Sequence, residues 1–456
     1  MVNSKRRWIL RQIELKKLST LSLPLILAQL AQSSMGFVDT VVAGRVSAND
    51  LAAVAIGSSV WFPLFLLLLG VLNALTPTIS QAHGAGQHDV IRQVTPQGIY
   101  LGGLAGLVIM LVLQHSSVIL PWFHTAPELI PLIEGYLHGV SWGFPAIGIC
   151  FALRYCSEGL SLTRPSMIVS FLGLAVNIGA NYVLVFGKLG FPAMGGVGCG
   201  PASAITMWVM FFGMLVVFWR GNIYRNLKML RFNAPWCWKT QKQLLKLGLP
   251  IGGGLFIECS IFAIIALLLA RFGAQSVAAH QIALNFTSMI FMIPLSIATA
   301  LSVRVGYTIG QQRKQQLLRT IRCGIAGAIA LAVISAAAIA LLPLQCVSIY
   351  TTDPQLSHAA ATLLFLAAIY QIPDAIQVNC AGALRGCKDT RVPMFIQTVA
   401  YWGIGLPVGC YLGLYLQWGA RGFWVGLICG LTSAAIMLVL RLRYILSRLN
   451  FQRQLN

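Results

Sequence analysis

The chain has 456 residues, of which 57% are hydrophobic and 9% are charged, and its formal net charge is +21. Soluble domains carry roughly 25% charged residues, so this composition excludes a soluble globular protein. Apolar runs recur along the whole chain, each long enough to cross the roughly 30 Å of a membrane's hydrocarbon core. We therefore expect an all-α polytopic membrane protein, because the short alternating segments typical of a membrane β-barrel do not occur in the sequence.

The polar, Gly- and Pro-containing connections divide the sequence into twelve predicted transmembrane helices. A basic leader at 1–19 precedes the first apolar run, which is too long for a signal-peptide core and has no small-residue cleavage site after it. We expect this run to be retained as the first helix. The predicted spans are 20–44, 52–80, 95–118, 134–156, 165–187, 195–219, 246–271, 279–307, 320–343, 360–383, 394–416 and 422–447.

The two halves of the sequence resemble each other when one is shifted by 226 residues. The shift places the Leu-Pro pair at 23–24 on the Leu-Pro pair at 249–250, and Arg45 on Arg271. Both halves hold six spans that begin on the same side of the membrane, so the repeat is parallel. We expect two pseudo-symmetric six-helix lobes around a central cleft, as in many secondary transporters. The predicted lobes are 20–219 and 246–447, with a cytoplasmic linker at 220–245 and a cytoplasmic tail at 448–456.

Basic residues gather in alternate connections, which is the positive-inside pattern. They occur in the leader, at Arg154 and Arg164, over 220–246 and 304–322, at Arg385, Lys388 and Arg391, and after Arg441. The intervening connections hold about one each. This alternation predicts that both termini are cytoplasmic, and it argues against nucleic acid as the partner of the positive charge.

Only eleven Asp and Glu residues occur, so each can be considered separately. Most lie in loops or at helix ends, where a solvated charge is the ordinary interpretation; Glu14 is one of these, and Glu158 is expected to reach the membrane interface. Three lie near the middle of a predicted span: Asp39, Glu258 and Asp374. A charge at the bilayer centre costs roughly 3 kcal/mol on insertion scales, so such residues usually face a cavity or a partner.

The surroundings of the three intramembrane acids favour a role in ion binding over a purely structural one. Glu258 follows the glycine run 252–254, which lets another backbone approach or the helix bend. Asp374 follows Pro373, which leaves a carbonyl free one turn earlier. The alternative is that each acid bonds neighbouring helices. However, no comparable set of intramembrane Lys or Arg occurs to neutralise them, and burial disfavours the charged form of a carboxyl, so protonation or Na⁺ binding would switch its charge.

Other polar residues within the predicted helices are less specific indicators of a binding site. Asn177 and Asn181 form a polar ridge one turn apart, and Gln281 and Asn285 form another that suits packing as well as binding. The eleven cysteines are scattered and read as small buried residues. No hydrolase elbow, Walker loop, HExxH or kinase pattern occurs, which argues against an ATP-driven pump or a membrane enzyme; no cofactor is expected.

Several segments, in order and over essentially the whole chain, resemble the multidrug and toxic compound extrusion (MATE) family, in its NorM-type branch. The resemblance implies twelve helices in two lobes, alternating access, and export of cationic, amphiphilic drugs and dyes in exchange for Na⁺ or H⁺ at a bacterial inner membrane, by a protein acting as a monomer. The segments are AQLAQSSMGFVDTVVAG, LTPTISQAHGAG, GGVGCG, LGLPIGGGLFIECSIF, AHQIALNFTSMIFMIP, VRVGYTIG and YQIPDAIQVNCAGALRGCKDTR.

The resemblance also implies roles for particular residues. Asp39 matches a coupling carboxylate of the family, with neutral oxygens nearby, and Glu258 and Asp374 match a cation-binding pair, so these three are the candidate Na⁺ ligands. Some members carry an aspartate where this chain has an asparagine, which leaves the ion of that lobe open with a slight preference for Na⁺. The neutral positions are Asn177, Asn181 and Ser203; the positions expected near substrate are Ser58, Gln281, Asn285, Phe291 and Asp353.

The rival hypothesis is a flippase for lipid-linked saccharides, because the wider superfamily shares this type of fold. Such a flippase would be expected to carry intramembrane Arg or Lys for pyrophosphate, whereas the candidate cavity residues here are acidic. Nutrient uptake in place of export is not excluded by composition. The drugs, the stoichiometry and the lobe that holds the substrate are left open.

Overall fold

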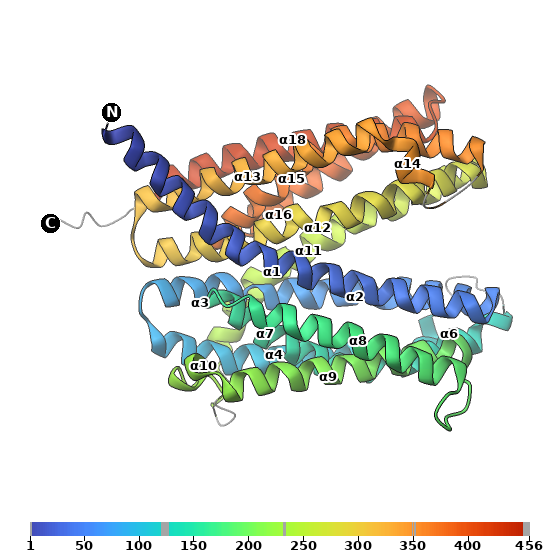
Figure 1. The fold of residues 1–456 in the computed structure, drawn as a ribbon, viewed down its shortest axis with the longest axis horizontal. Helices are drawn as coiled ribbons and strands as arrows, with labels where there is room; N and C mark the ends of the chain where they lie inside the picture. The colour runs from blue at the N-terminus through green and yellow to red at the C-terminus, as the bar shows by residue number, and fades with distance from the viewer. Residues whose placement is uncertain (1, 120–126, 231–233, 349, 351–352, 450–456) are drawn as a thin grey trace. The chain divides into compact units, whose positions relative to one another are not determined.

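The computed structural model describes residues 2–119, 127–230, 234–348, 350 and 353–449 (Figure 1). Within these residues all regular structure is helical. In the described part of the chain, eleven helices are long and apolar enough to cross a membrane. A pair of helices bent by 45°, Pro127–Ser141 and Phe144–Gly159, makes a twelfth when it is taken as one span. The predicted all-α polytopic membrane fold is confirmed.

The chain forms two compact units, Pro24–Gly252 and Met1–Leu23 together with Gly253–Asn456. The predicted lobes begin and end at connections between helices. The boundaries of the two units instead fall inside two helices, α1 (Val2–Val46) and α11 (Trp238–Leu269). Each of these helices begins in one unit and continues in the other. At 45 residues, α1 is roughly 68 Å long, well beyond the roughly 30 Å of a hydrocarbon core.

The unit Pro24–Gly252 contains the second part of α1 and the first part of α11. Its core is built where α4 packs on α7 and α8 packs on α9. Its other elements are α2 (Ala48–Asn73), α3 (Leu75–Gly84), α4 (His88–Gln114), α5 (Ser116–Ile119), η2 (Pro127–Leu129), α6 (Ile130–Ser141), α7 (Phe144–Gly159), α8 (Arg164–Phe186), η3 (Gly195–Gly198), α9 (Cys199–Arg220) and α10 (Asn222–Asn226).

The predicted span 134–156 is interrupted between α6 and α7. Pro145 lies in the first turn of α7, where its missing N–H needs no partner, and this position suits the start of a new helix. Gly143, at the break, lies so close to α9 that a Cβ there would come 2.9 Å from the Cα of Ala204. The bend is therefore explained by two features: Pro145 just after the break, and the close contact between Gly143 and α9 at the break.

The first part of α11 lies against α2, at the glycine run. Any side chain on Gly70 would overlap the backbone of Gly252, and one on Gly248 would overlap the backbone of Val71. The predicted approach of another backbone at this run is confirmed. The linker before it is held to α4 by Gln97, whose amide nitrogen donates to the Pro235 carbonyl at 2.8 Å.

The second unit contains the first part of α1 and the rest of α11. Within it, α12 packs on α15, and α13 and α18 also flank α15 (Figure 1). Its other elements are η4 (Ala270–Phe272), α12 (Ala274–Gly310), α13 (Lys314–Leu341), α14 (Pro343–Ser348), α15 (Pro354–Gly386), α16 (Arg391–Thr398), η5 (Val399–Gly405), α17 (Leu406–Cys410), η6 (Tyr411–Tyr415) and α18 (Ala420–Arg448).

The predicted span 394–416 alternates between two kinds of helix. Two of its segments, η5 and η6, are π-helical, with the α-helical α17 between them. Glycines let this span touch α18 closely: a side chain on Gly426 would overlap the backbone of Gly409, and one on Gly422 that of Gly413. Close backbone contact between small residues is a common way of packing membrane helices.

The leader is more buried than the sequence predicted. Glu14, expected to be a solvated charge, is 3% exposed and accepts hydrogen bonds from Arg304, Gln316 and Thr320. Arg304, counted from sequence among the cytoplasmic basic residues, is itself buried. The leader is therefore part of the folded unit, and its acid forms an internal ion pair.

Candidate functional site

The first candidate site surrounds Asp39 on α1, in the unit Pro24–Gly252. Its carboxylate is 8% exposed and accepts three hydrogen bonds. Asn181 and Asn177, one turn apart on α8, donate to Oδ1 at 2.7 and 3.1 Å, and Ser203 on α9 donates to Oδ2 at 3.0 Å. The Cys199 thiol lies 3.7 Å from the backbone carbonyl oxygen of Asp39. The structure thus places around Asp39 all three neutral residues that the sequence associated with this acid.

The partners of Asp39 are all neutral. Burying an ionised carboxylate is costly unless a charge or strong hydrogen bonds compensate it, and amide and hydroxyl donors compensate it only in part. The side-chain oxygens of Asn177 and Asn181 are buried without hydrogen-bond partners. If the two amides turned over, these oxygens would replace the nitrogens beside the carboxylate. The donor set therefore suits a small cation as well as a proton.

A second group of polar side chains lies close to Asp39. The Tyr136 hydroxyl is 3.2 Å from the Ser58 hydroxyl and accepts a hydrogen bond from the Trp61 indole at 3.1 Å. Tyr136 is within electrostatic range of Asp39. Ser58, a predicted substrate contact, is thus linked to the surroundings of the acid through a tyrosine that the sequence did not single out.

The second candidate site lies in the other unit, around Asp374 on α15 and Glu258 on α11. Asp374 is 3% exposed, Glu258 is partly exposed, and the two carboxyl groups are within electrostatic range of each other. The hydroxyls of Tyr370 and Tyr401 are in range of both acids. Oδ1 of Asp374 is buried without a hydrogen-bond partner. The structure therefore brings the predicted pair together and adds two tyrosines.

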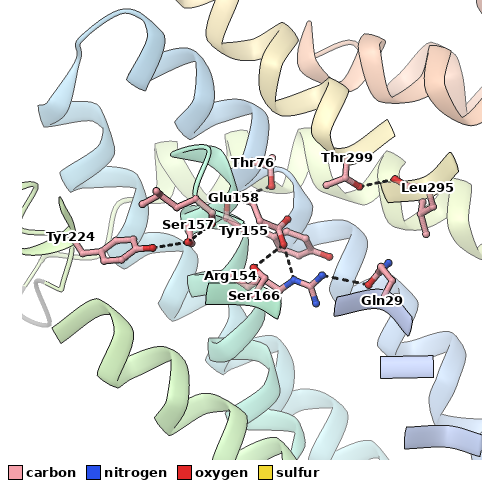
Figure 2. Close-up of polar contacts among 11 residues, drawn as sticks. Gln29, Thr76, Arg154, Tyr155, Ser157, Glu158, Ser166, Tyr224, Leu295 and Thr299 are labelled. Carbon is pink, nitrogen blue, oxygen red and sulfur yellow. Dashed lines mark hydrogen bonds and ion pairs between the residues drawn. The ribbon is translucent and has the colours of Figure 1, made fainter. Parts of the chain in front are cut away.

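Other buried acids are paired with arginine. Glu158, expected at the membrane interface, is fully buried; its Oε1 accepts from Arg154 at 2.7 Å and from Ser166 at 3.1 Å (Figure 2). Arg154 also reaches Gln29 on α1 at 3.4 Å. Arg154, counted from sequence among cytoplasmic charges, is 6% exposed. The i, i+4 spacing of Arg154 and Glu158 was the signal that could have revealed this pair.

A difference in pairing separates the acids. Among the residues described, Glu14, Asp89, Glu158 and Asp389 each form an ion pair with an arginine. Asp39 and Asp374 form none, and Glu258 is within electrostatic range of Arg385. No group of three or more His, Cys, Asp and Glu that could hold a metal occurs in the described part of the chain. Any cation bound here would rely on one or two carboxylates and neutral oxygens.

The five predicted substrate contacts do not form one cluster. Ser58 belongs to the unit Pro24–Gly252, and the other four to its counterpart. Gln281 and Asn285 are exposed on α12, and Phe291 on the same helix is partly buried. Asp353 caps α15, accepting a hydrogen bond from the backbone N–H of Gln355. These assignments stay predictions.

Comparison with known proteins gives one family. Residues 24–183 and 250–411 match the family MatE, and the two matched segments begin 226 residues apart, which is the shift of the internal repeat. The chain is 45% identical over 435 residues to the probable multidrug resistance protein NorM of Shewanella oneidensis, covering 94% of this chain and 95% of the relative. It is 43% identical to the multidrug resistance protein MdtK of Yersinia pestis, covering 95% and 96%.

Solved structures agree in fold. A mutant of the Vibrio cholerae MATE transporter VcmN superposes with a TM-score of 0.89 at 17% identity, covering 97% of this chain and 99% of that one. The eukaryotic MATE transporter AtDTX14 superposes with a TM-score of 0.86 at 19% identity, covering 98% of each chain. At these identities the likeness concerns the fold alone.

Proposed function

The chain belongs to the MatE family, and from this premise we propose that it is a secondary active antiporter that exports cationic, amphiphilic drugs and dyes in exchange for Na⁺ or H⁺. It resides in a bacterial inner membrane with both termini in the cytoplasm, acts as a monomer surrounded by lipid, and binds no nucleic acid. It is a transporter without an enzymatic reaction or cofactor.

One observation carries this proposal: Asp39 is a buried carboxylate with three neutral hydrogen-bond donors and no arginine, lysine or histidine paired with it in the described part of the chain. A structural acid in the same unit, Glu158, has its arginine. An acid without a fixed counter-charge becomes stable at depth by taking up a mobile one. That is the property an antiporter needs at its coupling site.

Coupling then follows from competition and differential binding. With the lobes open to the outside, Asp39, or the Glu258 and Asp374 pair, takes up Na⁺ or H⁺, and the negative charge that held a cationic drug is lost. The drug leaves, the lobes rock, and the ion is released inside. A ligand drives such a cycle only to the extent that it binds the two states with different affinity.

Purified protein in liposomes tests the proposal. Efflux of a cationic dye such as ethidium is followed under an imposed Na⁺ gradient and, separately, under an imposed pH gradient. Export driven by one gradient supports the proposal and identifies the ion. No dye movement under either gradient would overturn it and would bring the flippase forward.

A further inference from the structure

One face of α15 carries three buried polar side chains around the second acidic site. Tyr370, Asp374 and Gln377 recur at i, i+4 and i+7, so they lie on the same side of the helix. They are 8%, 3% and 0% exposed. The middle member is the acid, and it stands one turn from each of the others.

Gln377 is held at one end only. Its Nε2 donates a hydrogen bond to the Tyr401 hydroxyl at 2.8 Å, while its Oε1 is buried without a hydrogen-bond partner. Oδ1 of Asp374 is also buried without one. Native structures rarely leave buried acceptors unsatisfied, so two on successive turns of one face indicate room for a partner that both oxygens can bind, such as a cation.

Tyr401 reaches this face from a π-helical segment. It lies in η5, is 3% exposed, and its hydroxyl is within electrostatic range of Glu258 and Asp374. π-Helical turns are rare and occur often at functional sites, because the wider turn shifts the side chains that follow. Here the shifted turn places a hydroxyl where it fixes the amide of Gln377.

We propose that Gln377 is a ligand of the coupling cation, with its amide oxygen adding to the carboxylates of Asp374 and Glu258, and that Tyr401 is the positioning residue that turns this oxygen toward them. Hard cations such as Na⁺ bind carboxylate and carbonyl oxygens. A proton needs a single oxygen, whereas a cation needs several, so the loss of Gln377 weakens Na⁺ binding and leaves protonation in place. This inference rests on the proposed antiport, and it concerns a residue that no part of that proposal used.

The test measures Na⁺ binding directly, on the purified full-length chain, as displacement of radioactive sodium by unlabelled Na⁺. Gln377→Met keeps the size of the side chain and removes its oxygen. Tyr401→Phe keeps the oxygen and removes the group that orients it. We expect Gln377→Met to weaken Na⁺ affinity by ~10-fold or more and Tyr401→Phe by about threefold, with ethidium binding and thermal unfolding near wild type.

The chain offers matched controls for both variants. Gln371 lies on the same helix and is buried, but its amide oxygen already accepts a hydrogen bond from Ser335 at 3.0 Å. Tyr411 lies on the same span as Tyr401 but is exposed. Gln371→Met and Tyr411→Phe should therefore leave Na⁺ affinity unchanged.

The outcomes separate this inference from the proposed function. Unchanged or tighter Na⁺ binding by Gln377→Met would overturn the ligand assignment, and so would a wild-type protein without saturable Na⁺ binding; dye export under a pH gradient in the same preparation would still support antiport. Conversely, Na⁺ binding that Gln377→Met weakens, in a protein that exports no dye under either gradient, supports the assignment and overturns the proposed function.

Discussion

Nη2 of Arg304 donates hydrogen bonds to both carboxylate oxygens of Glu14, at 3.2 and 2.9 Å, across 290 residues of sequence. Gln316 and Thr320 donate to the same carboxylate at 3.0 and 3.1 Å. The carboxylate therefore accepts four hydrogen bonds, two of them from the charged guanidinium of Arg304. This network fastens the start of α1 to α12 and α13.

Breaking this ion pair on one side should destabilise the protein. Glu14→Ala leaves Arg304 buried without its counter-charge, an effect that typically costs about 3–5 kcal/mol, whereas removing both partners costs less. We expect the apparent melting temperature of the purified protein to fall markedly for Glu14→Ala and to recover in part when Arg304→Ala is added. Glu128→Ala, at an exposed position of η2, is the control. A double variant that melts below both single variants would contradict this reading.

Replacing the acid of the first site should abolish coupling. Asp39→Asn keeps the shape of the side chain but cannot change its charge, so we expect dye efflux from liposomes to fall to the level of protein-free vesicles under either gradient. Asp89→Asn, whose side chain is 94% exposed, should export as the wild type does. Wild-type efflux with an unchanged ion dependence in Asp39→Asn would show that this acid has no role in coupling.

Removing Gln97 should loosen the linker between the repeats. Besides its bond to the Pro235 carbonyl, its Oε1 accepts from the Cys237 backbone N–H at 3.0 Å and from the Gln241 amide at 3.2 Å. We expect Gln97→Ala to speed tryptic cleavage in this segment several-fold. Gln93→Ala, which removes only a 3.9 Å contact with the Cys237 thiol, is the control. Equal cleavage rates in the two variants would argue that the linker is held by other contacts.

Adding a methyl group where α18 contacts the π-helical span should destabilise the protein. A Cβ at position 426 would overlap the Cα of Gly409 and lie 2.6 Å from the Gly405 carbonyl oxygen. Gly426→Ala should destabilise by about 1–3 kcal/mol and lower the apparent melting temperature. The same change at Gly327, inside α13 with no neighbouring atom within 4 Å of the added carbon, should be neutral or slightly stabilising. Equal melting temperatures for the two variants would show that the contact between Gly426 and Gly409 can accommodate a methyl group, contrary to this prediction.

Much of the first site could be predicted from the sequence because its residues can be recognised from their immediate neighbours in the chain. An acid in an apolar run is costly wherever it lies, and Asn177 and Asn181 share a helix face through their spacing alone. Their convergence on Asp39 came from the resemblance to the family, because contacts over more than a hundred residues leave no local signal.

The remainder was missed for physical reasons that differ from residue to residue. Glu14 looked solvated because it lies among basic residues in a leader, and its partner is distant in sequence. Tyr401 was hidden by the π-helical turn, since a period of 3.6 residues assigns the wrong face once the helix widens. Tyr136 was not singled out, because its partners Ser58 and Trp61 lie 75 or more residues away in the sequence.

The division of α1 and α11 between the two units bears on how such a chain can arise. Each repeat opens with a helix whose first segment is built into the other unit, at Leu23 in one repeat and at Gly252 in the next. Two six-helix chains that had exchanged their leading segments would form a domain-swapped dimer with this connectivity. In the present chain the same exchange of leading segments occurs within one polypeptide, so that each unit contains residues from both repeats.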